Sequence, residues 1–336
     1  MKIDATEIII QQMLTTTPPA FTIDQAIALA FTHYGIEAGA RLLVSDRDQN
    51  FRLDATDGQR FTLKISNHAE QFKVVDFQNC ALQHAERYDH SLPLPRVIPN
   101  TQGDTICQVK KCDESYFVRV LSWLDGVVLG DDNANSELSR RLGGLLARIG
   151  LVFKDFDHPG SNPPLLWDMK RASGLRALLG HIEDHELRQL VEKTLDQFDK
   201  YVKPRLDTLR SQVIHNDLNL GNVLMSKQDP DQISGVIDFG DLVKSPLIID
   251  LAIAAAYQLS DGDDPLSGAL PMIAGYNAVC PLQDEEVHLL TDLIRTRLIT
   301  SLLIGSFRVT LFPENREYLL ISHKAATNSL ISLQKL

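Results

Sequence analysis

Short segments in the first 124 residues alternate between hydrophobic and polar positions. A period of two is typical of strands that bury one face. Phe61, Leu63 and Ile65, for example, share one face of a segment. The opposite face of that segment carries Thr62 and Lys64. The strands predicted in this way span residues 41–45, 50–56, 60–65, 106–110 and 116–124. They predict a small antiparallel sheet.

Two helices are predicted within the same part of the chain. The first begins at Thr22, where Gln25 completes a capping box, and it ends near Gly35. The second runs from about residue 72 to residue 88. The proline-containing stretch Leu92–Pro95 follows it and interrupts regular structure. We therefore expect one main helix to be inserted among the strands.

From Asp125 onward the spacing of apolar residues becomes helical. The predicted helices span about residues 138–153, 187–209, 248–259, 285–307 and 317–333. Two strand-like pieces, 222–226 and 234–239, interrupt them. We predict an α+β fold with two lobes, in which residues 1–124 carry the sheet and residues 125–336 are mainly helical. Ligands often bind in a cleft between two such lobes.

The composition is that of an ordinary globular protein, with 44% hydrophobic and 23% charged residues. No stretch approaches the roughly 20 apolar residues that a membrane helix needs. The first residues lack the layout of a signal peptide, so we expect a cytoplasmic location. There are 33 Lys and Arg residues against 44 Asp and Glu residues, a net charge of −11. This balance disfavours nucleic acid or an anionic membrane as the partner.

The strongest chemical signal is a short run in the second lobe. His215, Asp217 and Asn222 follow the spacing His-x-Asp-x-x-x-x-Asn. The run Val-Ile-Asp-Phe-Gly comes soon after it and contains Asp238. Phosphoryl transfer needs a nucleophile in line with the phosphate and neutralisation of the phosphate charge. Asp217 can orient and deprotonate an attacking hydroxyl, while oxygens of Asn222 and Asp238 can hold Mg²⁺.

Lys64 adds a cation from the first lobe. It lies at the end of the predicted strand 60–65 rather than in a flexible loop. A lysine that faces the cleft from this position can pair with the α- and β-phosphates of a nucleotide. No zinc site and no nucleophilic serine is indicated near these residues.

Together these residues resemble the aminoglycoside phosphotransferase and choline kinase superfamily, which shares the protein-kinase-like fold. The resemblance covers nearly the whole chain. A narrower likeness is to the hydroxylysine kinases, and to the kinase-like part of bacterial fusions with a pyridoxal-phosphate aminotransferase. That likeness rests on Asp46–Phe51, Phe61–Ser66, Leu166–Asp168, Gly235–Asp241 and Asp250–Ala252.

The resemblance implies roles in nucleotide binding and in support of the catalytic loop. Lys64 would contact the nucleotide phosphates. Backbone groups of Ser122, Trp123 and Leu124 would receive the purine. His215 would brace the catalytic loop. Residues 1–124 would then be the nucleotide-binding lobe, and residues 125–336 the catalytic and substrate lobe.

On the acceptor side the resemblance implies three further roles. Asp241 would hold the substrate or stiffen the metal site. Trp167 would line the substrate pocket. Asp250 would anchor the start of a helix.

Two features depart from the wider kinase pattern. The loop that begins at Ser45 contains no glycine. Its backbone amides, or the side chains of Ser45, Gln49 and Asn50, would therefore meet the phosphates. The usual glutamate partner of the strand lysine is not obvious either. The candidates are Gln78, Asp76 and Glu70.

These observations favour a magnesium-dependent kinase that transfers the γ-phosphate of ATP or GTP to a hydroxyl of a small amine or amino acid. The resemblance makes 5-hydroxylysine the first choice of acceptor, and hydroxylysine kinases favour GTP. Choline, homoserine, methylthioribose and an aminoglycoside are alternative acceptors, because one fold hosts many substrates. An inactive kinase-like domain that only binds a nucleotide is the rival hypothesis. The acceptor, the choice of nucleotide and the oligomeric state stay open.

Overall fold

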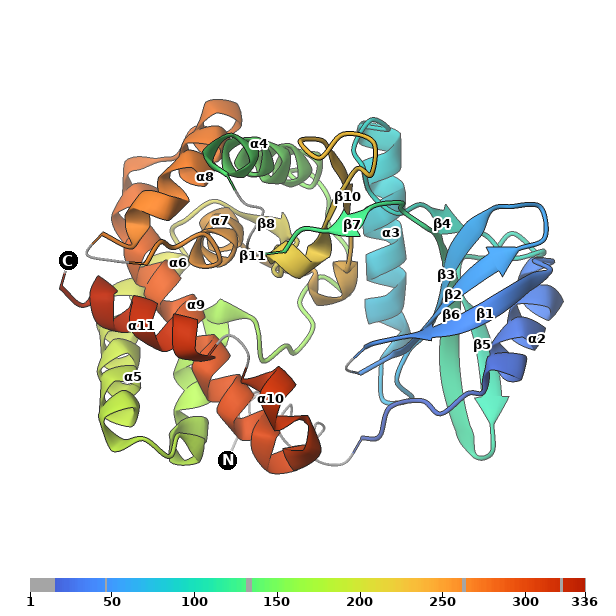
Figure 1. Cartoon of the computed structure of the whole chain (residues 1–336), viewed down its shortest axis with the longest axis horizontal. Coiled ribbons are helices and arrows are strands. Elements are labelled where there is room, and N and C mark those ends of the chain that lie inside the picture. Colours follow the sequence, from blue (N-terminus) through green and yellow to red (C-terminus); the bar gives the residue numbers. More distant parts are fainter. Residues whose placement is uncertain (1–15, 46, 131–134, 262–263, 321–322, 336) are drawn as a thin grey trace.

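A computed structural model describes residues 16–45, 47–130, 135–261, 264–320 and 323–335. A sheet lies on one side of the molecule and a bundle of helices on the other (Figure 1). The predicted two-lobed α+β fold is confirmed. Asp46, part of the likeness described above, lies outside the described residues. So do residues 321 and 322 of the last predicted helix. Within the described ranges, no helix combines the length and apolar character that crossing a bilayer requires.

The sheet lobe consists of helix α2 and strands β1 to β6. The strand bounds are β1 Ala38–Leu43, β2 Gln49–Ala55, β3 Arg60–Ile65, β4 Val97–Ile98, β5 Cys107–Lys111 and β6 Glu114–Ser122. The spatial order is β1-β2-β3-β6-β4, with β5 paired to β6, and all pairings are antiparallel. The first strand starts earlier than predicted, because residues 38–40 pair with residues 53–55 of β2.

Helix α2, Ile23–Tyr34, has the predicted ends. The Thr22 hydroxyl accepts a hydrogen bond from the Gln25 backbone, and the Gln25 side chain accepts one from the Thr22 backbone. Gly35 closes the helix in the left-handed region, at φ 65°. A glycine adopts this conformation without the steric cost that other residues bear.

Helix α3, Phe72–Tyr88, has the predicted bounds and lies between the two lobes (Figure 1). Its buried residues Phe77, Leu82 and Ala85 belong to the large core of the helical lobe. The sheet has a separate, smaller core around Phe51 and Leu63. Although α3 lies between strands of the sheet lobe in the sequence, its buried apolar side chains pack against the helical lobe.

In the helical lobe several helices pack against one long helix, α9. The bounds are α4 Ser136–Val152, α5 His185–Gln197, α6 Lys203–Leu206, α7 Leu247–Ala256, α8 Leu266–Val279, α9 Asp284–Leu311, α10 Arg316–Leu319 and α11 His323–Leu333. A 3₁₀ segment, Met169–His181, precedes α5, and a π-helical turn, Phe198–Val202, interrupts the predicted helix 187–209. Short helices α10 and α11 occupy the described part of the predicted helix 317–333.

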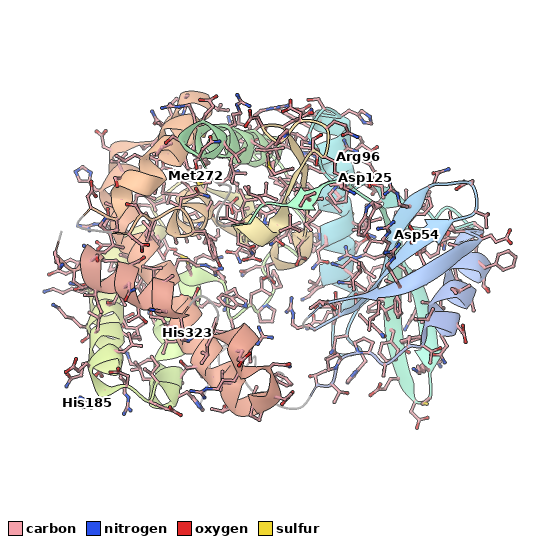
Figure 2. All side chains as sticks on the ribbon, viewed as in Figure 1. Asp54, Arg96, Asp125, His185, Met272 and His323 are labelled. Atoms are coloured by element: carbon pink, nitrogen blue, oxygen red, sulfur yellow. The ribbon has the colours of Figure 1, made fainter. Side chains whose placement is uncertain are left out.

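Helix α8 was not predicted, and its glycines and an internal proline explain why. Pro271 lies inside the helix, where it removes a backbone donor. A Cβ on Gly275 would lie 1.9 Å from the Arg140 carbonyl oxygen. A Cβ on Gly143 of α4 would lie 2.0 Å from the carbonyl oxygen of Met272, which is fully buried on α8 (Figure 2). These residues, unfavourable for an isolated helix, allow α4 and α8 to pack in close contact.

Two small sheets hold the segments that carry the candidate chemistry. Strands β7 Val127–Val128, β9 Val223–Met225 and β10 Ile233–Val236 form one sheet, and β8 Ser211–Ile214 pairs with β11 Val243–Pro246 in the other. Neither β8 nor β11 was predicted, and β10 ends three residues earlier than predicted. The loop after β8 and the loop after β10 are therefore held side by side, since Ile237 donates its N–H to the Asn222 carbonyl at 2.9 Å.

Candidate active site

The catalytic loop, residues 215–222, is anchored at its start by Asp250 of α7. The two carboxylate oxygens of Asp250 accept the backbone N–H groups of His215 at 3.0 Å and Asn216 at 2.8 Å. Asn216 has a positive φ of 66°, a strained conformation for a non-glycine residue that these bonds help to maintain. Asp250, expected from the sequence to anchor the start of a helix, thus holds the start of the loop 215–222 as well.

His215 is fully buried and joins the two loops. Its Nε2 lies 3.1 Å from the Ile237 carbonyl oxygen, and its ring meets Phe239 edge to face at 4.7 Å. Its Nδ1 accepts the backbone N–H of Asp217 at 3.3 Å, so Nε2 is the nitrogen that carries the proton. These contacts support the predicted bracing role.

Asp217 is held by three side chains. One carboxylate oxygen, Oδ2, accepts hydrogen bonds from Asn219 and Asn222, each at 3.0 Å. The other, Oδ1, lies 3.2 Å from Nη2 of Arg297. Burial raises the pKa of Asp217 to about 6, while Arg297 opposes the rise and Asp241 adds to it. A carboxylate with this pKa suits a general base that works near neutral pH.

Asn222 and Asp238 fit a magnesium site by their donor atoms and their orientation. The side-chain nitrogen of Asn222 points at Asp217, so its oxygen is left for another partner. Asp238 has a positive φ of 63°. The Lys64 ammonium holds the pKa of the Asp238 carboxyl below its usual value, although burial acts in the opposite direction. An amide oxygen and an ionised carboxylate are hard ligands of the kind that Mg²⁺ prefers.

Lys64 pairs with Asp238 rather than with any of the three candidates from the sequence. Its Nζ lies 3.8 Å from Oδ1 of Asp238. Asp76 instead accepts a hydrogen bond from His158 at 3.2 Å. Within the described part of the chain, neither Gln78 nor Glu70 pairs with Lys64.

Gln78 occupies the space between the sheet and the loop of Asp238. Its side-chain oxygen accepts a hydrogen bond from Arg119 of β6, and its nitrogen donates to the Gly240 carbonyl at 2.9 Å. Arg119 is buried, stands opposite Lys64 in the strand register and also donates to Asn79 at 2.8 Å. A neutral amide on α3 thus connects a buried arginine to the loop of Asp238.

Of the side chains predicted to bind phosphate, Ser45 in the loop between β1 and β2 and Gln49 at the start of β2 have other partners. The Ser45 hydroxyl donates to the carbonyl of Asp48. Gln49 exchanges hydrogen bonds with the backbone of Phe21 at 2.7 and 2.9 Å. The side-chain oxygen of Asn50 is buried and has no hydrogen-bond partner among the described residues.

Arg47, which the sequence analysis did not single out, is the residue of this loop that reaches the second lobe. One of its nitrogens lies 3.2 Å from Oδ1 of Asp241. Burial raises the pKa of Asp241, and Arg47 acts against that rise. Its position within the Asp46–Phe51 likeness was the available signal.

The segment predicted to receive the purine already uses two of its backbone donors. Ser122 donates its N–H to the Arg96 carbonyl at 2.8 Å, and Trp123 donates to the Arg60 carbonyl at 3.1 Å. The side chain of Leu124 faces Gly235, where a Cβ would come within 3.0 Å of it. A purine would have to use the remaining backbone groups of this segment.

Trp167 lies beside Arg297 of α9, which contacts the Asp217 carboxylate. The Arg297 guanidinium is 4.6 Å from the centre of the Trp167 ring and 5.5 Å from that of Tyr257. It also donates to the Tyr257 hydroxyl at 2.7 Å. Neither Arg297 nor Tyr257 was selected from the sequence. The signal that could have found Arg297 is its helical spacing from Leu290, Leu293 and Ile304, which puts a cation on the apolar face of a predicted helix.

Comparisons with known proteins agree with this geometry. A family model described as "Phosphotransferase enzyme family" matches residues 39–277. Hydroxylysine kinase of Xenopus laevis is 28% identical over 345 residues, which cover 95% of this chain and 91% of the relative. Hydroxylysine kinase of Mus musculus is 27% identical over 348 residues, which cover 96% and 92%.

A solved structure of an amicoumacin kinase in complex with AMP-PNP, Ca²⁺ and amicoumacin shares the fold. Its TM-score to this chain is 0.69, with 14% sequence identity, and the match covers 92% of this chain and 94% of the other. At that identity the match shows the fold alone. It confirms the protein-kinase-like architecture that the sequence predicted.

Proposed function

The chain belongs to the phosphotransferase enzyme family and is a small-molecule kinase, and on this premise we propose that it phosphorylates a hydroxyl of a small amine or amino acid, with 5-hydroxylysine as the first choice. Kinases of this family use a nucleotide, ATP, as the donor. The observation that carries the proposal is the position of Asp217. It is held by Asn219, Asn222 and Arg297 and has a pKa of about 6.

Each side chain of the site has a task in this reaction. Asp217 orients the acceptor hydroxyl and takes its proton as the oxygen attacks the γ-phosphorus. Asn222 and Asp238 would hold magnesium, which neutralises phosphate charge when it is bound with the nucleotide. Lys64 moves from Asp238 to the nucleotide phosphates. In this proposal, residues 1–124 form the nucleotide-binding lobe, residues 125–336 form the catalytic and substrate lobe, and the protein acts in the cytoplasm.

The names of the two hydroxylysine kinases support 5-hydroxylysine as the acceptor, because the likeness covers more than nine-tenths of this chain. Choline, homoserine, methylthioribose and an aminoglycoside are the alternative acceptors, and GTP is the alternative donor. The presence of Asp217, Asn222 and Asp238 in one arrangement argues against an inactive domain.

An acceptor screen tests the proposal. The purified chain would be incubated with Mg²⁺, with ATP or GTP, and with each candidate acceptor in turn. Formation of nucleoside diphosphate and a new phosphate-ester signal in phosphorus NMR would both be followed. We expect turnover with 5-hydroxylysine. If every acceptor fails while nucleotide still binds, the inactive-domain hypothesis is correct instead.

A further inference from the structure

Arg297 has more hydrogen-bonding capacity than its neighbours use. Arg297 is 2% exposed. Its Nη2 serves both Asp217 and Tyr257, at 3.2 and 2.7 Å. Its Nε and Nη1 are buried and have no hydrogen-bond partner in the part of the chain that the structure describes. Buried donors of a charged group are normally paired, since leaving them unpaired costs free energy.

The two unpaired nitrogens belong to a guanidinium that is already next to the catalytic carboxylate. If Arg297 served only to hold Asp217, a single N–H would satisfy that contact. The guanidinium instead keeps further in-plane N–H donors, of which those on Nη1 lie beside Nη2 at its free end and can bind a second carboxylate. Trp167 and Tyr257 flank it, and both are half-buried. Both rings therefore lie against the guanidinium, and both are themselves partly open to solvent.

We propose that Arg297 binds the carboxylate of the acceptor and thereby selects amino acids over amines. This inference rests on the proposed function. A few carbon atoms separate the reacting hydroxyl from the carboxylate in a hydroxylated amino acid. With the hydroxyl at Asp217, the carboxylate can reach Nη1, which is bonded to the same carbon as the Nη2 that contacts Asp217. An amine without a carboxylate leaves Nη1 unpaired.

The charges around the site agree with this assignment. Asp217, Asp238 and Asp241 are the carboxylates that face the reacting region, and Asp241 contributes to the field at Asp217. They favour the ammonium groups of an amino acid and disfavour its carboxylate, which therefore needs a dedicated cation. Lys64 and Arg47 are engaged by Asp238 and Asp241. Of these three cations, Arg297 is the one with buried nitrogens that have no partner among the described residues.

A matched pair of acceptors tests the inference: 5-hydroxylysine and its decarboxylated analogue, 1,5-diaminopentan-2-ol. Both carry the same hydroxyl and the same side-chain amine. We expect the wild-type enzyme to prefer the amino acid by about 100-fold in kcat/KM, as a site does when it pairs a charged group of its substrate. In Arg297→Gln the preference should fall to within about threefold, mainly through KM for the amino acid. Arg297→Lys should keep an intermediate preference.

Arg295→Gln is the matched control, because Arg295 lies on the same helix but binds Asp292 at 2.7 Å and the Leu333 carbonyl. It should keep the wild-type preference. Thermal unfolding of each variant shows whether it folds. If Arg297→Gln does not fold, the wild-type preference and Arg297→Lys decide the question.

Other outcomes contradict the role of Arg297 in binding the carboxylate, and they differ from the outcomes that would contradict the kinase function. Equal kcat/KM of the wild type for both acceptors overturns the inference while the kinase activity stands. A fall in kcat that is the same for both acceptors in Arg297→Gln shows that Arg297 only positions Asp217. Calorimetric binding of the two acceptors in the presence of AMP-PNP adds a readout without turnover. If the wild type phosphorylates none of the candidate acceptors, both proposals fail.

Discussion

The side-chain nitrogen of Lys64 lies 3.8 Å from a carboxylate oxygen of Asp238, and this ion pair joins the sheet lobe to the loop that follows β10. The lysine and the carboxylate are the two groups expected to act on opposite sides of the nucleotide phosphates. In the absence of a nucleotide they neutralise each other. Binding of a nucleotide with Mg²⁺ would therefore replace the Lys64–Asp238 ion pair by two others. Lys64 would pair with phosphate and Asp238 with the metal, so neither charge would be left without a partner.

Replacement of Asp238 tests this exchange. We expect Asp238→Asn to weaken nucleotide binding in the presence of Mg²⁺ by about tenfold or more, because a charged metal ligand is lost. Without Mg²⁺ the same variant should bind nucleotide at least as well as the wild type, because Lys64 is released. Isothermal titration with ADP, with and without Mg²⁺, measures both effects.

Asp54→Asn is the control for this comparison. Asp54 forms ion pairs with Arg41 and Arg52 on the sheet, away from the site (Figure 2). It should leave both affinities unchanged. Unaltered affinity of Asp238→Asn in Mg²⁺ would contradict the metal role of Asp238.

Replacement of the base should separate chemistry from binding. Asp217→Asn keeps the size of the side chain but cannot accept a proton, so we expect kcat to fall by about 10³-fold. Nucleotide affinity should stay within about threefold of the wild type, because the contacts of Asp217 are to Asn219, Asn222 and Arg297. A coupled assay of nucleoside diphosphate measures the rate, and wild-type turnover in this variant would refute the assignment.

The raised pKa of Asp217 predicts a pH dependence with a definite sign. The base must be ionised, so kcat/KM for the nucleotide should fall about tenfold per pH unit below about pH 6. Arg297 favours the ionised form, and Arg297→Gln should therefore move the midpoint to higher pH. Rates between pH 4.5 and 8 measure this, with circular dichroism as the check on folding. A midpoint near the ordinary value for aspartate would show that burial does not control this group.

The contact of Gln78 with Arg119 and Gly240 should matter for the nucleotide site more than for stability. Gln78→Leu removes both hydrogen bonds, and we expect kcat/KM for the nucleotide to fall by about 10- to 100-fold. Gln78→Glu restores an acceptor for Arg119 but, when ionised, cannot donate to the Gly240 carbonyl. It should therefore stay impaired. A rate equal to the wild type in both variants would mean that the loop of Asp238 is held by other contacts.

The close packing of α4 on α8 can be tested at two neighbouring glycines. A Cβ on Gly143 would lie 2.0 Å from a backbone oxygen of α8, whereas a Cβ on Gly144 would meet its nearest neighbours at 3.7 Å. We expect Gly143→Ala to lower the free energy of unfolding by about 3 kcal/mol or more. Gly144→Ala should raise it by up to about 1 kcal/mol, because alanine favours the helix. Urea denaturation of the two variants gives the comparison, and equal effects would argue against the packing.

Local patterns were enough to locate the strand that carries Lys64 and the helix that lies beside the site. Strand β3 and helix α3 have the predicted bounds. Apolar residues recur every two positions in the strand and every 3.6 positions in the helix, and a proline follows the helix, so both signals lie within a few consecutive residues. The spacing of Asp217 and Asn222 on one loop and the position of Asp238 in the run that follows were likewise readable, since phosphoryl transfer needs a base and oxygen ligands for the metal.

The tertiary structure alone decided which distant residues meet. Strands β8 and β11 are short and lie about thirty residues apart, so their pairing leaves no local signal. Helix α8 contains a proline and glycines that are compatible with a helix only because α4 approaches it. The sequence determined that Lys64, Asp217, Asn222 and Asp238 form a kinase-like set. Folding determined that Lys64 faces Asp238, and that Arg297, eighty residues beyond Asp217, lies against it, because long-range packing brings these side chains together.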